Sequence, residues 1–208
     1  GLTGLFLAAL ALSGAAPVFA ADVPPPLTQN GGTWRTSHVQ GIAVDLQGGC
    51  IYYSFTTLLA KYDFGGKLIG TLTGWAGHLG DLDFNPRDGR VSGSLEYKKD
   101  NAFYIAIIDV GRLDRVGMNA GTADIFRTVY LPEVVKDYTA DVNGDGRFDG
   151  DDGKFSQHVA DSPDHRYDCS GIDGVSFGPE FGHVDGPRFL TVAYGIYRNI
   201  ARIDNDQQ

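Results

Sequence analysis

Residues 38–45 read HVQGIAVD, residues 78–85 read HLGDLDFN, and residues 171–179 read GIDGVSFGP. Within each segment apolar and polar residues alternate, which is the pattern of a half-buried β-strand. Each segment is followed by a turn rich in Gly, Asp or Pro and then by a second strand-like segment. The second segments are residues 50–55, 90–97 and 188–194. This recurrence predicts a repeated unit built from antiparallel strands.

The first unit continues into two further strand-like segments, residues 59–64 and 67–72, which Gly65 and Gly66 join. Four strands within about 40 residues, from His38 to His78, is the spacing of one β-propeller blade. Residues 102–110 and 125–131 complete a second blade, and only part of a third can be traced. Because an unfinished blade exposes strand edges, we expect the chain to be part of a longer protein.

The repeats resemble the secreted β-propellers of the NHL-repeat and gluconolactonase-like group, over residues 38–208. The resemblance implies an all-β fold of four-stranded propeller-like blades, of which about two and a half are visible. The alternative is a β-sandwich, in which strands also recur at roughly 8 to 12 residues. The expected divisions are a signal peptide (1–20), an extended segment (21–37), blades one and two (38–131), an insertion (132–169) and a partial third blade (170–208).

The N-terminus has the features of a secretory signal peptide. Residues 1–20 carry no charge and contain the apolar run 5–12, and small residues stand at Val18 and Ala20. This pattern predicts cleavage after Ala20, with a retained membrane anchor as the alternative. We therefore expect a secreted or periplasmic protein that has no membrane association after cleavage.

Composition narrows the classes of partner. The 208 residues include 42% hydrophobic and 21% charged residues, and the formal net charge is -9. An acidic surface disfavours nucleic acid and anionic membranes, so neutral molecules and cations are the expected partners. The 29 glycines and 12% aromatic residues favour strands and tight turns over long helices.

The insertion contains the clearest chemical motif, DVNGDGRFDGDD at residues 141–152. Gly146 stands at loop position 6, where the chain turns sharply, and Arg147 at position 7 would offer only its backbone carbonyl. The oxygen-bearing side chains at positions 1, 3, 5, 9 and 12 are Asp141, Asn143, Asp145, Asp149 and Asp152. The spacing predicts a Ca²⁺ site, and an acidic, solvated turn is the alternative.

The residue at position 12 separates this loop from typical EF-hands. Asp152 stands where those loops have a longer Glu, so the segment resembles a dockerin-type or bacterial EF-hand-like loop. Dockerins use two such loops to bind a partner, and only one is visible here. A short helix over residues 131–138 is expected to enter the loop. We therefore favour calcium as a structural clip over a regulatory switch or a docking module.

Weaker catalytic candidates are His38 and His78, which occupy equivalent positions in consecutive repeats, and Asp173 in the third. In a propeller the first strand of each blade is innermost, so these residues would face the central channel, together with Asp81 and more faintly Glu96. Resemblance to the lactonase-like propellers implies a role in binding a metal or polarising a substrate. The alternative is that each histidine only hydrogen-bonds a neighbouring backbone.

The sequence contains no nucleophile elbow, phosphate-binding glycine loop, zinc spacing or dinucleotide fingerprint. Cys50 and Cys169 fall on non-adjacent blades, so both are expected to be unpaired thiols. The hypothesis we favour is an exported, non-enzymatic protein that binds calcium and an unidentified small molecule, glycan or protein on a propeller face. The alternatives are a lactonase- or esterase-like hydrolase and a dockerin-like assembly module.

Overall fold

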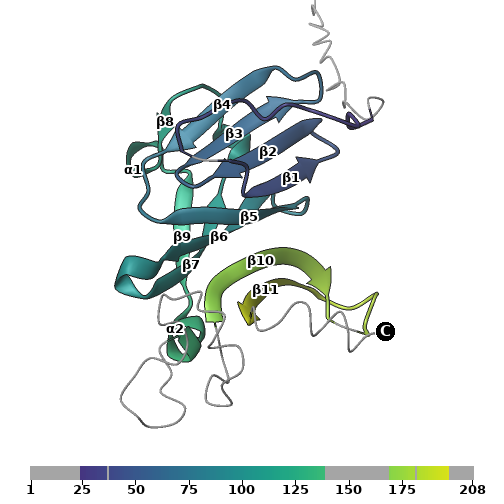
Figure 1. Ribbon diagram of the computed structural model, residues 1–208. Coiled ribbons are helices and arrows are strands. Elements are labelled where there is room, and N and C mark those ends of the chain that lie inside the picture. The colour runs from purple at the N-terminus through teal and green to yellow at the C-terminus, as the bar shows by residue number, and fades with distance from the viewer. Residues whose placement is uncertain (1–23, 37, 139–168, 181, 197–208) are drawn as a thin grey trace, which may run out of the picture.

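The computed structural model describes residues 24–36, 38–138, 169–180 and 182–196 (Figure 1). Within these ranges strands dominate and helices are few and short, so the all-β prediction is confirmed. The strands form three sheets, and among the described residues these sheets do not close into a barrel or a propeller. No helix in the described part of the chain has the length and apolar character needed to cross a membrane.

The first sheet has five strands, of which the first four form an antiparallel meander in chain order. Its strands are β1 (Gly41–Asp45), β2 (Cys50–Phe55), β3 (Leu58–Asp63) and β4 (Leu68–Thr73). In the turn between β1 and β2, Asp45 Oδ1 accepts hydrogen bonds from the backbone N–H groups of Gln47 and Gly48. Gly49 then adopts a φ of 63°, a conformation that costs a glycine little and other residues more.

The second sheet repeats this meander with β5 (His78–Asn85), β6 (Arg90–Tyr97), β7 (Ala102–Ile108) and β9 (Phe126–Tyr130). A short 3₁₀ turn, η1 (Lys98–Asp100), connects β6 to β7. In both sheets the first strand lies at one edge, and β5 contacts β1 on one side and β10 on the other (Figure 1).

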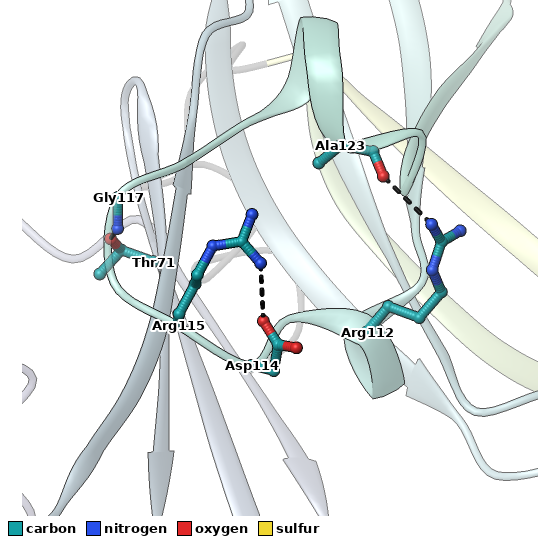
Figure 2. Close-up of polar contacts among 6 residues, drawn as sticks. All are labelled: Thr71, Arg112, Asp114, Arg115, Gly117 and Ala123. Atoms are coloured by element: carbon teal, nitrogen blue, oxygen red, sulfur yellow. Dashed lines mark hydrogen bonds and ion pairs between the residues drawn. The ribbon is translucent and has the colours of Figure 1, made fainter.

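The connection from β7 to β9 returns to the first sheet before it completes the second. It contains η2 (Val110–Arg112), β8 (Met118–Asn119) and α1 (Ala120–Ala123), and β8 pairs in parallel with β4. Figure 2 shows how the loop is held: Gly117 N donates to Thr71 Oγ1 at 2.8 Å, and Arg112 Nη2 donates to Ala123 O at 3.2 Å. The loop therefore ties the second sheet to the outer strand of the first.

The third sheet is the hairpin of β10 (Cys169–Pro179) and β11 (Arg188–Ile196). Before it comes α2 (Pro132–Tyr138), which confirms the helix expected to precede the calcium-loop motif. Val134 of α2 packs with Phe103 of β7 and Ile172 of β10 in one small apolar cluster. This cluster joins the helix, the second sheet and the third sheet.

The main core lies between the first two sheets. Ala43 and Tyr52 of the first sheet and Leu82 of the second belong to one buried cluster, and the ring of Tyr52 stacks on Phe84 at 6.0 Å. The two first strands approach closely at Gly41, because a Cβ there would lie 2.6 Å from the Asp81 Cα. Any larger residue at position 41 would push the sheets apart.

Candidate functional site

The face of the second sheet that contacts β10 carries polar side chains where a core face would carry apolar ones. Asp81 and Asp83 lie on β5, and both bond to the backbone of β10. Ser92, Ser94 and Glu96 alternate along β6, so they share one face of that strand. We call these five residues the docking seam.

The two aspartates hold β10 by its backbone. Asp81 Oδ2 accepts a hydrogen bond from Val175 N at 3.0 Å, and Asp83 Oδ2 accepts one from Phe177 N at 2.6 Å. The second oxygen of Asp83 accepts the N–H of Phe84 at 2.8 Å, which fixes the orientation of the carboxylate. Carboxylates thus replace the backbone carbonyls that a neighbouring strand would offer. Hydrogen bonds to an ionised acceptor are stronger than neutral ones.

Glu96 makes a third contact of the same kind, because its Oε1 accepts the N–H of Ile172 at 2.5 Å. His78 is half-buried and lies directly opposite Glu96 in the register of β5 and β6. The seam therefore runs from the His78 end of the second sheet to Asp83, and it meets β10 from Ile172 to Phe177.

Two serines in equivalent positions differ in their hydrogen bonding. Ser54 of β2 is fully buried, and its hydroxyl donates to the carbonyl of Gly80 in the next sheet. Ser94 occupies the matching position on β6 and is also fully buried, but its hydroxyl has no hydrogen-bond partner among the residues that the structure describes. A buried hydroxyl without a partner is destabilising, so the seam is less completely satisfied than the contact between the first two sheets.

The structure places the three catalytic candidates in different surroundings. His38 is exposed, and its Nε2 lies 3.3 Å from Gln40 Nε2, whereas His78 belongs to the seam region. Their two segments do approach the same end of β2, because Gln40 N donates to Ser54 O and Leu79 N donates to Thr56 O.

Asp173 lies in β10, and its side chain is outside the described part of the structure. The register of β10 against β11 shifts between Ile172, which pairs with Tyr194, and Gly174, which pairs with Ala193. Asp173 therefore stands at an irregularity of the strand. A similar shift occurs in β5 between Leu79 and Leu82, which is where Asp81 lies. Such bulges re-aim side chains and are common next to binding sites.

The predicted calcium ligands Asp141, Asn143, Asp145, Arg147, Asp149 and Asp152 lie outside the described residues. What the structure does describe are the two elements on either side of this segment, α2 and β10. Within the described residues, no three His, Cys, Asp or Glu side chains converge to hold a metal ion.

Cys50 is the one cysteine whose side chain the structure describes. It is buried and free, and its Sγ lies 3.4 Å from the Gly48 carbonyl. Burial raises the pKa of the Cys50 thiol, and it also raises the pKa of the neighbouring Tyr52 hydroxyl. Both groups are therefore neutral at physiological pH, and the thiol is a weak nucleophile there.

The sequence named Asp81 and Glu96 only as companions of the histidines, and it missed Asp83 and Ser94. The sequence did contain one signal for these residues. Acidic and hydroxyl residues alternate on β5 and β6, and the equivalent positions of the first repeat hold Gly41, Ala43 and Tyr52 instead. The described geometry makes these carboxylates acceptors for a docked strand. No protein-family model matches this chain, and no curated protein matches its sequence.

Proposed function

We propose that this chain belongs to an exported, calcium-binding β-propeller protein in which calcium is structural and a propeller face binds a ligand or protein. Two observations support the propeller-like arrangement. Two four-stranded antiparallel meanders follow one another, and their first strands, β1 and β5, lie in contact together with β10. This order of strands and contacts is the one expected for consecutive blades.

The structural role of calcium rests on the anchoring of α2 and β10. These elements precede and follow the calcium-loop motif, and both pack on the cluster of Phe103, Val134 and Ile172. The two described elements on either side of residues 139–168 therefore lie close together. A metal that folds this segment would also hold α2 against β10, and binding to the folded state alone stabilises that state.

The carboxylates of the docking seam have a structural use, which leaves the hydrolase alternative to the residues it was proposed on, His38, His78 and Asp173. Asp81, Asp83 and Glu96 each accept a backbone N–H from β10, so these oxygens already hold the third sheet. A general acid or base needs a carboxyl oxygen within hydrogen-bond reach of the substrate.

Calorimetric titration with Ca²⁺ tests the metal site. Asp141→Ala combined with Asp145→Ala removes two of the predicted ligands, and we expect it to abolish tight binding. Asp151→Ala is the matched control, because it removes a carboxylate of the same loop at a position that does not ligate. For the unmodified chain, Ca²⁺ at about 100 times its Kd should raise the unfolding free energy by about 2.7 kcal/mol. Equal titrations for both variants would refute the site.

A further inference from the structure

Residues 29–34 pack on the face of the first sheet that is turned away from the second sheet, and we call them the strap. Gly31 is buried within the strap, and a Cβ on this residue would lie 3.2 Å from the ring of Tyr53. Its carbonyl accepts hydrogen bonds from the Tyr62 hydroxyl at 3.1 Å and from Trp34 Nε1 at 2.9 Å. The fit of the strap therefore depends on the position of one small peptide unit.

The residue before Gly31 is an exposed asparagine whose side chain folds back over the strap. Asn30 Oδ1 accepts a hydrogen bond from Gly32 N at 2.9 Å. To reach the N–H of the second residue along the chain, the carboxamide has to turn back past the peptide nitrogen of Gly31. The turn therefore holds Asn30 Cγ on the same side of the chain as this nitrogen, and Gly31 has no Cβ to obstruct their approach.

We propose that Asn30 is a site of spontaneous deamidation. The Gly31 nitrogen forms a bond to Asn30 Cγ, and the side-chain nitrogen leaves as ammonia with the proton that Gly31 loses. The N–H of Gly32 already bonds to the oxygen that gains negative charge in this step, and such a donor stabilises the charge. A water molecule then opens the five-membered imide at either carbonyl, which gives aspartate or isoaspartate at position 30.

Two other asparagines have the same turn and differ in the residue that follows. Asn119 and Asn85 each accept a hydrogen bond from the backbone N–H two residues later, at 2.9 Å and 3.1 Å. Asn119 precedes Ala120, whose Cβ hinders the approach of its own nitrogen. Asn85 precedes Pro86, whose nitrogen carries no hydrogen to lose. The chain therefore contains two internal controls for Asn30 with a similar hydrogen bond.

The isoaspartate product releases the strap. In isoaspartate the main chain runs through the side-chain carbon, so it is one methylene longer before Gly31. The Gly31 carbonyl then moves away from Tyr62 and Trp34, and Tyr53 loses the glycine that lies on its ring. The aspartate product keeps the length of the main chain and an oxygen acceptor for Gly32, so it leaves the strap in place.

Peptide mapping of the full chain during incubation at mildly alkaline pH tests the proposal. The peptide that contains Asn30 should gain about 1 Da, because oxygen replaces the amide nitrogen. It should do so about tenfold faster than the peptide with Asn119, and the peptide with Asn85 should change least. Mapping is required because residues 143 and 144 form a second Asn-Gly pair. Asn30→Ser is the matched control, since its hydroxyl can accept the same N–H and it has no amide to lose.

The same incubation in urea separates the effect of the turn from that of the sequence. Asn30 should convert at least as fast in the folded chain as in the unfolded chain, because the turn aligns the reacting atoms. A folded-state rate well below the unfolded-state rate would show that the turn protects Asn30, and it would overturn the proposal. Equal rates at Asn30 and Asn119 in the folded chain would also overturn it.

The fluorescence of Trp34 tests the release of the strap. The chain has two tryptophans, so Trp75→Phe leaves Trp34 as the only reporter. Its emission should move to longer wavelength as isoaspartate accumulates, because the indole leaves its edge-to-face contact with Phe55, where the ring centroids are 6.2 Å apart. In the same background Asn30→Asp should keep the original emission. Isoaspartate that is detected by isoaspartate-specific enzymatic methylation without a change in emission would overturn the release.

Discussion

Ser54 and Ser94 show how two copies of one repeat position can be used differently. Both hydroxyls are fully buried on the second strand of their sheet. Ser54 donates to the carbonyl of Gly80 and so links the first sheet to the second. Ser94 faces the contact with β10, where carboxylates already accept the backbone N–H groups, and within the described ranges its hydroxyl has no partner. A serine side chain therefore stabilises the first sheet and destabilises the second.

Replacing each serine by alanine measures this difference. Ser54→Ala should lower the free energy of unfolding by about 0.5 to 1.5 kcal/mol, because it removes a hydrogen bond and leaves the Gly80 carbonyl short of a donor. Ser94→Ala should leave the free energy unchanged or raise it by up to about 0.5 kcal/mol, since no hydrogen bond is lost. Urea unfolding of both variants is the measurement, and each variant controls for the other. Equal losses would show that Ser94 has a partner in solution.

At the scale of elements, the third sheet is attached to the second through side chains. β10 does not pair with β5 or β6 as a neighbouring strand, because each sheet is separate. Its N–H groups at Val175 and Phe177 instead bond to the carboxylates of Asp81 and Asp83. The hairpin should therefore open independently of the first two sheets when these acceptors are removed.

Hydrogen exchange can detect this opening. Asp81→Ala combined with Asp83→Ala should speed exchange of the Val175 and Phe177 amides roughly tenfold to a hundredfold, because each loses a charged acceptor worth about 1.5 to 3 kcal/mol. Amides of β2 and β3 should keep their protection.

Asp88→Ala is the matched control for this pair. Asp88 is an exposed turn residue whose carboxylate accepts a local hydrogen bond from Arg90 N and forms an exposed ion pair with the Arg90 side chain at 3.9 Å. The control should leave exchange at Val175 and Phe177 unchanged. Equal protection of these amides in both variants would show that apolar packing at Ile172, and not the carboxylates, holds the hairpin.

The strands could be predicted because their signals are local. Alternating residues and glycine turns place β2, β3 and β4 within one residue of the expected positions, whereas β1 begins at Gly41, three residues after the start of the expected segment. The helix before the calcium motif begins at Pro132, one residue later than expected. The return of β8 to pair with β4 was not predicted. Only two residues, Met118 and Asn119, form that strand, so it has no period to detect.

The site was predictable only in part, because its contacts join distant residues. Asp81 and Val175 are far apart in the chain, and an acidic residue on a strand gives no sign that its acceptor is a backbone N–H. The histidine proposal relied on equivalent repeat positions. The structure gives the two residues different exposure, since His38 is exposed and His78 is half-buried opposite Glu96.

At the scale of the whole molecule, the core between the first two sheets contains two groups, Cys50 and Tyr52, whose ionisation is suppressed by burial. Burial raises the pKa of Cys50 above its ordinary value of 9.0 and the pKa of Tyr52 above its ordinary value of 10.0. In the unfolded chain both groups would ionise near their ordinary values. The folded state retains these protons to higher pH, so its stability is undiminished below pH 9 and falls as pH rises above it.

Urea unfolding at pH 8, 9, 10 and 11 measures this loss of stability. A single group can lower the free energy of unfolding by up to about 1.4 kcal/mol per pH unit. Tyr52→Phe removes one of the two groups and keeps the ring that stacks on Phe84. Its unfolding free energy should therefore fall less steeply between pH 10 and 11 than that of the unmodified chain, while the two curves run parallel below pH 9.

Tyr130→Phe, at a 48% exposed tyrosine on β9, is the control and should follow the unmodified curve. A Tyr52→Phe curve parallel to the unmodified one up to pH 11 would mean that the hydroxyl ionises within the folded protein. The core between the sheets would then admit charge without global unfolding.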